Sequence, residues 1–151
     1  IQLAAKSDQE WKVKWFVGDL ARLPLLDQSM DLLLDIFSPA NYQEFKRVLA
    51  PEGRLIKVIP TAAHLQEIRQ KVKDHLDQAD YSNEQIIQHF SDHFTIENTI
   101  HCQETFELTP ALREALLSMT PLLFHVNPAQ IDWNDLTQVT ISATILIGRS
   151  N

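Results

Sequence analysis

Two short groups of small and polar residues are candidates for binding a ligand, because each lies at the end of an apolar run that is expected to be a strand. Gly18-Asp19 comes directly after Val13–Val17, and Asp35–Pro39 lies at the end of Met30–Phe37. These runs and the segments after them have the strand–loop–strand–helix rhythm of a parallel α/β sheet. Ligands of such sheets bind at the carboxyl ends of the strands. The two groups are therefore predicted to form a ligand-binding rim.

The elements that must hold this rim alternate between strand and helix. Lys12–Val17 is predicted to be a strand, and Met30–Phe37, the most apolar run, to be a central strand buried on both faces. Asn41–Leu49 places its apolar residues on one face of a helix. Pro51-Glu52-Gly53 is expected to be a turn that leads into a strand at Arg54–Ile59.

The remaining segments continue the α/β pattern. In chain order we expect the end of a helix (1–8), a helix (63–76), a linker (Asp80-Tyr81), a helix capped by Ser82, a strand (94–108), a helix capped by Thr109, an apolar break (119–124), a helical piece (127–135) and a strand (138–147). Thr109 precedes Pro110, and these residue types are favoured at the N-cap and at the first helical position. One α/β domain accounts for the whole pattern.

Composition describes an ordinary globular protein. The 151 residues are 44% hydrophobic and 22% charged, which suits one domain with its own core. No run approaches the roughly 18–20 apolar residues of a membrane span, and the start lacks the basic and apolar lead of a signal peptide. With one cysteine, Cys102, a reducing, cytoplasmic location is expected. A net charge of −7 argues against a broad nucleic-acid footprint on this segment alone.

Metal binding within the chain is not expected. A cysteine zinc site needs more than Cys102, and His64, His101 and His125 lack the spacing of four residues that places two ligands on one helix face.

The stretch from Gly18 to Pro60 resembles the second half of a class I S-adenosylmethionine-dependent methyltransferase. The pieces that carry the resemblance are Gly18-Asp19, Leu23-Pro24, Ser29-Met30-Asp31, Phe45, Arg47-Val48-Leu49 and Pro51-Glu52-Gly53, in this order. Glu52 stands where that family usually has a glycine. Downstream, IPTAAHLQEIRQKV and above all Leu116–Pro121 (LLSMTP) are similar to bacterial large-subunit ribosomal RNA guanine-N1 methyltransferases.

The resemblance implies a Rossmann-like, seven-stranded fold that is present here without its first two strands. Residues 1–151 would be the C-terminal part of a single catalytic domain. That family begins with a cysteine zinc module, which would hold the only zinc, and then a first βαβ unit with a glycine-rich turn, and neither is found in this sequence. We therefore expect a chain from which an N-terminal part is missing.

The resemblance also implies roles for the rim. The cofactor S-adenosyl-L-methionine would contact Gly18, Asp19, Leu20, Ile36 and Phe37, with Asp19 at the adenine amino group. Ser38, Pro39 and Asn41 would face the acceptor, and Phe124, Trp133 or Phe37 would stack on the flipped base. Asp35 is the nearest candidate for a base that removes the proton from guanine N1, or it is a solvated or helix-capping carboxylate. Met119-Thr120-Pro121 is expected to serve packing or a hinge, or to contact RNA directly.

Three functions stay open. The first is methyl transfer to N1 of a guanine in a ribosomal RNA hairpin, with RNA contacts supplied by the complete protein. The second is methyl transfer to a small molecule, which the acidic charge favours. The third is a catalytically incomplete folding or dimerisation unit. Without the missing strands Met30–Phe37 would expose a long apolar edge, which a second copy of the chain would cover in a homodimer. The 151 residues alone are expected to bind S-adenosylmethionine poorly.

Overall fold

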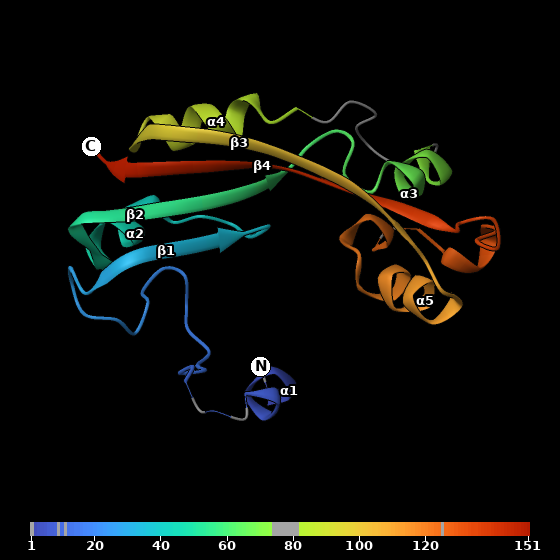
Figure 1. The fold of residues 1–151 in the computed structure, drawn as a ribbon, viewed down its shortest axis with the longest axis horizontal. Coiled ribbons are helices and arrows are strands. Elements are labelled where there is room, and N and C mark those ends of the chain that lie inside the picture. Colours follow the sequence, from blue (N-terminus) through green and yellow to red (C-terminus); the bar gives the residue numbers. More distant parts are fainter. Residues whose placement is uncertain (1, 9, 11, 74–81, 125) are drawn as a thin grey trace.

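A computed structural model describes residues 2–8, 10, 12–73, 82–124 and 126–151. Its centre is a mixed sheet in the order β1-β2-β4-β3, made of β1 (Met30–Ile36), β2 (Leu49–Pro60), β3 (Phe94–Glu107) and β4 (Gln138–Ser150). β1 is parallel to β2, and β4 pairs antiparallel with both β2 and β3 (Figure 1). The expected α/β class is confirmed.

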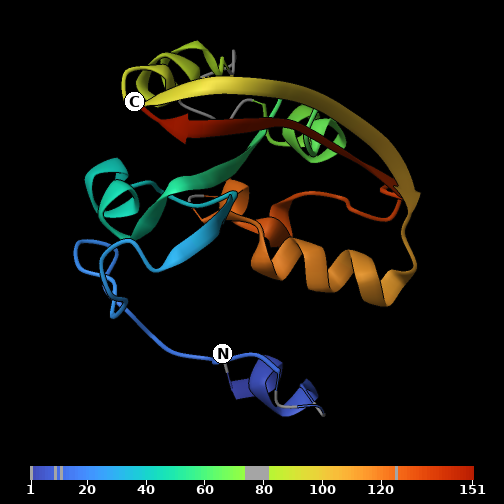
Figure 2. The same cartoon turned by 60° about the vertical axis from the view of Figure 1, so that its left-hand side comes forward.

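Helices gather at the two ends of the long strand β4. α2 (Tyr42–Val48) and α4 (Glu84–Ser91) lie toward its carboxyl end, and α3 (Gln66–Lys71) and α5 (Pro110–Met119) toward its amino end (Figure 1). Two short 3-10 helices follow α5, at Pro121–Leu123 and Pro128–Gln130. α1 (Gln2–Ser7) lies apart from the sheet (Figure 2). None of the described helices is long and apolar enough to cross a membrane.

The two groups of helices bury two apolar clusters. The first lies under α2 and α4 and contains Tyr42, Phe45, Leu49, Leu55, Ile59, Phe90, Phe94 and Leu146. The second lies under α3 and α5 and contains Leu65, Ile68, Val72, Leu123, Leu136 and Val139. The carboxyl ends of β1 and β2 lie between the two clusters, so the expected rim borders both.

The predicted strand Lys12–Val17 is wrong, because this segment has no strand hydrogen bonds in the structure. Its large apolar side chains are exposed, with 48% of Phe16 and 83% of Val17 accessible. A strand forms only beside a partner that accepts and donates its backbone hydrogen bonds. No described strand lies next to this segment, so its β-forming residues are left extended without a sheet.

Met30–Phe37 is a strand, as predicted, but its central position is wrong. β1 pairs only with β2 and is an edge of the described sheet. Leu32, Leu34 and Ile36 are each more than half exposed, whereas Asp35 is buried. The apolar run indicated burial on both faces, but among the described residues the face that carries Leu32, Leu34 and Ile36 is left exposed. The exposed apolar edge expected in that case is observed.

The expected turn Pro51-Glu52-Gly53 is a bulge inside β2. Leu49 faces Met30 across the pair and Arg54 faces Leu32, so the four residues 50–53 of β2 lie opposite the single residue Asp31 of β1. A Cβ on Gly53 would lie 2.9 Å from the carbonyl oxygens of both Ala50 and Met30. The bulge therefore requires glycine because the two backbones approach closely here.

Several helix boundaries differ from those expected. The helix predicted at 63–76 begins only at Gln66, since 62–65 form turns, and 74–76 lie outside the described residues, as does the linker Asp80-Tyr81. Asn83, rather than Ser82, is the N-cap of α4. The helical piece predicted at 127–135 is one 3-10 turn. Thr109 caps α5 as predicted, by accepting a hydrogen bond from the Leu112 amide.

Candidate functional site

The loop after Gly18 is fixed to α2. The Leu23 amide donates to Oε1 of Glu44 at 2.6 Å, and Arg47 donates to the carbonyls of Leu23 and Leu25. The hydrogen bond from Arg47 lowers the pKa of Glu44, which keeps this carboxylate charged. These contacts hold the whole loop against the helix that follows β1.

The same contacts bring the two predicted halves of the rim together. The side-chain amide of Asn41 donates to the carbonyl of Leu20 at 3.3 Å, and its oxygen caps α2 by accepting from the Glu44 amide. Asp19 is exposed beside this contact, and its Oδ1 accepts from the Ala21 amide at 2.9 Å. The loop after the first apolar run thus lies at the carboxyl end of β1.

A buried ion pair supports the end of β1. Nζ of Lys57 donates to Oδ2 of Asp35 at 2.5 Å and to the Ser38 carbonyl at 3.0 Å, and the Ser38 hydroxyl donates to Oδ1 of Asp35. Asp35 is 3% exposed and Lys57 4%. The carboxylate predicted as a base therefore already accepts two hydrogen bonds and holds the segment that follows it.

Two large residues near this edge adopt left-handed backbone conformations. Phe37 has φ of 51° and Leu65 has φ of 53°. Such conformations cost of order 1–3 kcal/mol in a residue other than glycine and persist only where the surroundings impose them. The Phe37 amide donates to the Val58 carbonyl, and the Leu65 amide to the Thr140 carbonyl, so the sheet holds both. Both side chains line the same cavity.

This cavity has a volume of about 960 Å³ and is mainly apolar. It is lined by the loop after β1, the ends of β2 and α3, the start of α4, and the segment that ends α5: Phe37, Ser38, Pro39, Ala40, Tyr42, Lys57, Val58, Ile59, Pro60, His64, Leu65, Arg69, Gln85, Ile86, His89, Leu116, Met119, Thr120, Pro121, Leu122, Val126 and Ile141. A concave, mostly apolar site with few polar groups suits a small organic ligand.

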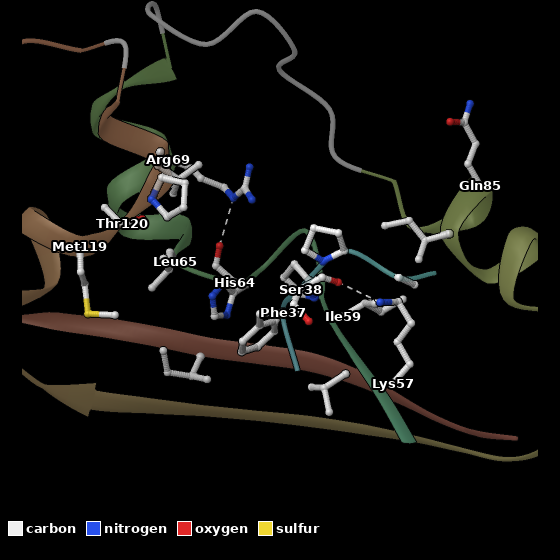
Figure 3. A pocket seen from close by; sticks show the side chains of 18 of the residues that line it. Phe37, Ser38, Lys57, Ile59, His64, Leu65, Arg69, Gln85, Met119 and Thr120 are labelled. Carbon is white, nitrogen blue, oxygen red and sulfur yellow. Dashed lines mark hydrogen bonds between the residues drawn. The ribbon is translucent and has the colours of Figure 1, made fainter. Parts of the chain in front are cut away.

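His64 is a polar side chain on the cavity wall that is held by its neighbours. Its Nδ1 accepts a hydrogen bond from the Ser142 amide at 3.3 Å, and its ring lies 5.0 Å from the ring of Phe37 (Figure 3). Nε of Arg69 donates to the His64 carbonyl at 3.1 Å. Burial, and then the positive charge of Arg69, lower the pKa of His64. The imidazole is therefore neutral near pH 7, with its proton on Nε2.

The predicted site residues divide into two groups. Phe37, Ser38 and Pro39 line the cavity, whereas Gly18, Asp19, Leu20 and Ile36 lie outside it, on the loop and strand beside it. Asn41 joins the groups through Leu20. Phe124 does not line the cavity and is 71% exposed, and the Trp133 indole donates to the Pro128 carbonyl.

Lys57, His64, Arg69 and Thr120 are among the cavity residues that were not predicted as site residues. Thr120 belongs to the LLSMTP segment, so the sequence carried a signal there, although not for a ligand. Nothing in the spacing of the other three indicates that they meet. The described residues contain no group of three or more His, Cys, Asp or Glu side chains that could hold a metal ion, and His125 lies outside them.

The curated relatives that this chain resembles are named for one activity. The chain is 33% identical over 137 residues to a Bacillus subtilis protein, YxjB, provisionally named a 23S rRNA guanine-N1 methyltransferase, and the match covers 89% of this chain and 49% of the relative. It is 26% identical to a Streptomyces fradiae protein named 23S rRNA (guanine(748)-N(1))-methyltransferase, over 84% of this chain and 47% of the relative. The chain thus spans about half the length of these curated relatives. No protein-family model matches it.

Solved structures show the fold. A SAM-dependent methyltransferase from Thermotoga maritima matches with a TM-score of 0.52 at 17% identity, over 97% of this chain and 69% of that one. A geranyl diphosphate methyltransferase in complex with GPP and sinefungin matches with a TM-score of 0.52 at 13% identity, over 98% of this chain and 57% of that one. The chain therefore has the α/β fold of S-adenosylmethionine-dependent methyltransferases, and its sequence is similar to that of proteins named as 23S rRNA guanine-N1 methyltransferases.

Proposed function

We propose that this chain is the C-terminal part of a catalytic domain that transfers a methyl group from S-adenosylmethionine to N1 of a guanine in large-subunit ribosomal RNA. The observation that carries the proposal is the sequence similarity to proteins with that name over 89% of the chain. The cavity beside the end of β1 supports it, because ligands of α/β sheets bind at this edge.

The residues proposed for the cofactor fit one side of such a ligand. The Leu20–Asn41 hydrogen bond holds the exposed carboxylate of Asp19 near the end of β1. Ile36 and Phe37 offer half-exposed apolar side chains at the same strand end, and Gly18 allows the chain to turn close to Pro24. A carboxylate suits the adenine amino group, and apolar side chains suit the adenine ring. When bound, the cofactor supplies an electrophilic methyl group on a sulfonium.

We also propose that the complete fold has seven strands, with the first two strands and a zinc module supplied by residues upstream. The free edge of β1 supports this proposal, because Leu32, Leu34 and Ile36 are more than half exposed and Val13–Val17 has no strand partner. A second copy of the chain would also cover this edge, so a homodimer is the alternative. Light scattering at several concentrations separates the two, because a dimer changes mass on dilution.

On the acceptor side, the target guanine would lie against Ser38 and Pro39 in the loop after β1. Asn41 fixes that loop. Orientation of the acceptor in line with the methyl group supplies most of the acceleration in such a transfer. The role of Asp35 as a base stays a prediction. Phe124 is exposed, which leaves its ring accessible for stacking on RNA. With a net charge of −7, this segment relies on other parts of the protein for phosphate contacts.

The proposal is tested on ribosomal RNA from cells with and without the gene. A methyl group on N1 blocks the Watson–Crick edge of guanine, so reverse transcriptase stops one nucleotide before it. We expect a stop in 23S rRNA that disappears on deletion and returns with the gene. An unchanged pattern of stops excludes this RNA as the substrate and leaves methyl transfer to a small molecule as the alternative.

A further inference from the structure

The segment Phe37-Ser38 makes a strained turn at the end of β1. Phe37 has φ of 51°, in the left-handed region that residues other than glycine rarely adopt. Its ring lines the cavity 5.0 Å from the ring of His64, and Ser38 lines the cavity next to it. A strained conformation of this kind persists only where the surroundings impose it. The contacts that hold the turn therefore set where both side chains lie.

Among the described residues, three hydrogen bonds hold this turn. The Phe37 amide donates to the Val58 carbonyl at 3.0 Å. Nζ of Lys57 donates to the Ser38 carbonyl at 3.0 Å, and the Ser38 hydroxyl donates to Oδ1 of Asp35. Figure 3 shows Lys57 extending from β2 to Ser38, with the Phe37 ring turned toward His64. Two of the three bonds, both to charged groups, thus come from Lys57 and Asp35, and without them only the amide bond remains.

The pair of Asp35 and Lys57 is itself fixed by burial. The two residues face one another in the register of β1 and β2, and their charged atoms lie 2.5 Å apart. Asp35 is 3% exposed and Lys57 4%, so water does not replace either partner. Asp35 does not line the cavity, and the Lys57 ammonium is engaged by Asp35 and Ser38. The pair therefore affects a ligand through the turn that it holds.

We propose that Lys57, together with Asp35, is a positioning residue for the methyl transfer. It holds Phe37 where the cofactor requires it and Ser38 where the acceptor base requires it. This inference rests on the proposed function, which assigns those two contacts. A misplacement of about 1 Å in such a site costs about a hundredfold in rate. In this role Asp35 takes no proton, so positioning is an alternative to its predicted role as a base, and the test separates the two.

The test uses Lys57→Met and the double variant Asp35→Leu/Lys57→Met. The single variant leaves a buried carboxylate without its partner, whereas the double variant leaves no buried charge and is expected to unfold close to the wild type. The initial rate of methyl transfer to 23S rRNA from cells without the gene is measured with protein from the complete gene. Both variants are expected to be slower by about tenfold or more. If the pair only stabilised the fold, the rate would recover together with the stability.

NMR of the same protein follows the turn directly. The wild type is expected to show a nuclear Overhauser effect between the rings of Phe37 and His64, and the double variant to lose it. The ammonium protons of Lys57 are expected to exchange slowly with water in the wild type, which tests the contact without a mutation. Rapid exchange of these protons would overturn the inference.

Leu55→Ala is the matched control. Leu55 is fully buried in β2 and does not line the cavity, and its truncation destabilises by leaving a void. This variant is expected to unfold earlier than the wild type but to keep the rate and the contact between the rings of Phe37 and His64. It shows how much of any loss of rate follows from lower stability alone.

The remaining outcomes are distinct. A double variant that is stable and slow but keeps the ring contact would overturn positioning and favour Asp35 as a base. A double variant as fast as the wild type would overturn both roles. If the wild type does not methylate 23S rRNA, the proposed substrate fails, and loss of the ring contact in the double variant still supports the positioning of Phe37 by Lys57.

Discussion

Asp35 and Lys57 face one another across the parallel strands β1 and β2 and form a buried ion pair of 2.5 Å, and Lys57 also lines the cavity. Removing one partner of such a pair leaves an uncompensated charge, which costs about 3–5 kcal/mol. Lys57→Met is therefore expected to lower the free energy of unfolding by about this amount in urea denaturation.

The control for this prediction is the exposed pair of Arg54 and Glu97, in which the Arg54 side chain is 45% accessible. Pairs in solvent contribute about 0–1 kcal/mol, so Arg54→Met is expected to have a small effect. Asp35→Leu combined with Lys57→Met is expected to restore much of the stability lost in the single variant. A smaller loss in Lys57→Met than in Arg54→Met would contradict the assignment.

Two buried threonines are expected to respond in opposite directions to replacement by valine. Thr140 donates to Glu67 at 2.5 Å and accepts from Gln66, whereas the Thr120 hydroxyl has no described partner. Thr140→Val should lower the free energy of unfolding by about 1–3 kcal/mol, because Oε1 of Glu67 loses the donor hydroxyl and only Oε2 keeps its bond from the Thr140 amide. Thr120→Val should raise it, by about 1 kcal/mol. Thermal unfolding without ligand measures both changes. A lower free energy of unfolding in Thr120→Val would show that the Thr120 hydroxyl has a hydrogen-bond partner.

His64 predicts a dependence of stability on pH. Its pKa in the folded protein lies below the ordinary value of 6.5, so between the two values the unfolded chain binds more protons. The contribution of neutral His64 to the free energy of unfolding is therefore complete above pH 6.5, and it is lost as the pH falls through the lowered pKa. Urea unfolding between about pH 7 and about pH 5 should show this slope, and His64→Gln should reduce it. The same slope in both proteins would assign it to other groups.

The 151 residues on their own are expected to bind S-adenosylmethionine weakly. Asp19, Ile36 and Phe37 form one side of the proposed cofactor site, and further strands are proposed beside β1, which is an edge of the described sheet. Titration calorimetry with the isolated chain measures this, with the same chain extended by its upstream residues as the comparison. Micromolar affinity in the isolated chain would contradict the proposed missing half.

Local sequence determined the elements whose signals are complete within a few residues. Thr109-Pro110 starts α5, and Asn41 starts α2 with its buried face of Tyr42, Phe45 and Val48, because a cap and a helical apolar face act over one or two turns. The strands β3 and β4 followed from alternating, β-branched sequences. The apolar run of β1 correctly predicted a strand but not its position in the sheet. Whether a strand is at an edge depends on which other strands pair with it, and its own sequence does not show this.

Only the tertiary structure places residues 61–67 at the cavity that the loop after β1 also lines. Residues 61–67 are bound to β4 by the Leu65 amide and the Glu67 carboxylate, across more than 70 positions of sequence, and this forces Leu65 into a left-handed conformation and fixes His64 beside Phe37. Pairings over such separations depend on sheet order, which local patterns do not encode. The sequence by itself therefore predicted that the loops at Asp19 and after Phe37 lie together, and only the folded sheet brought Lys57, His64 and Thr120 to the cavity beside them.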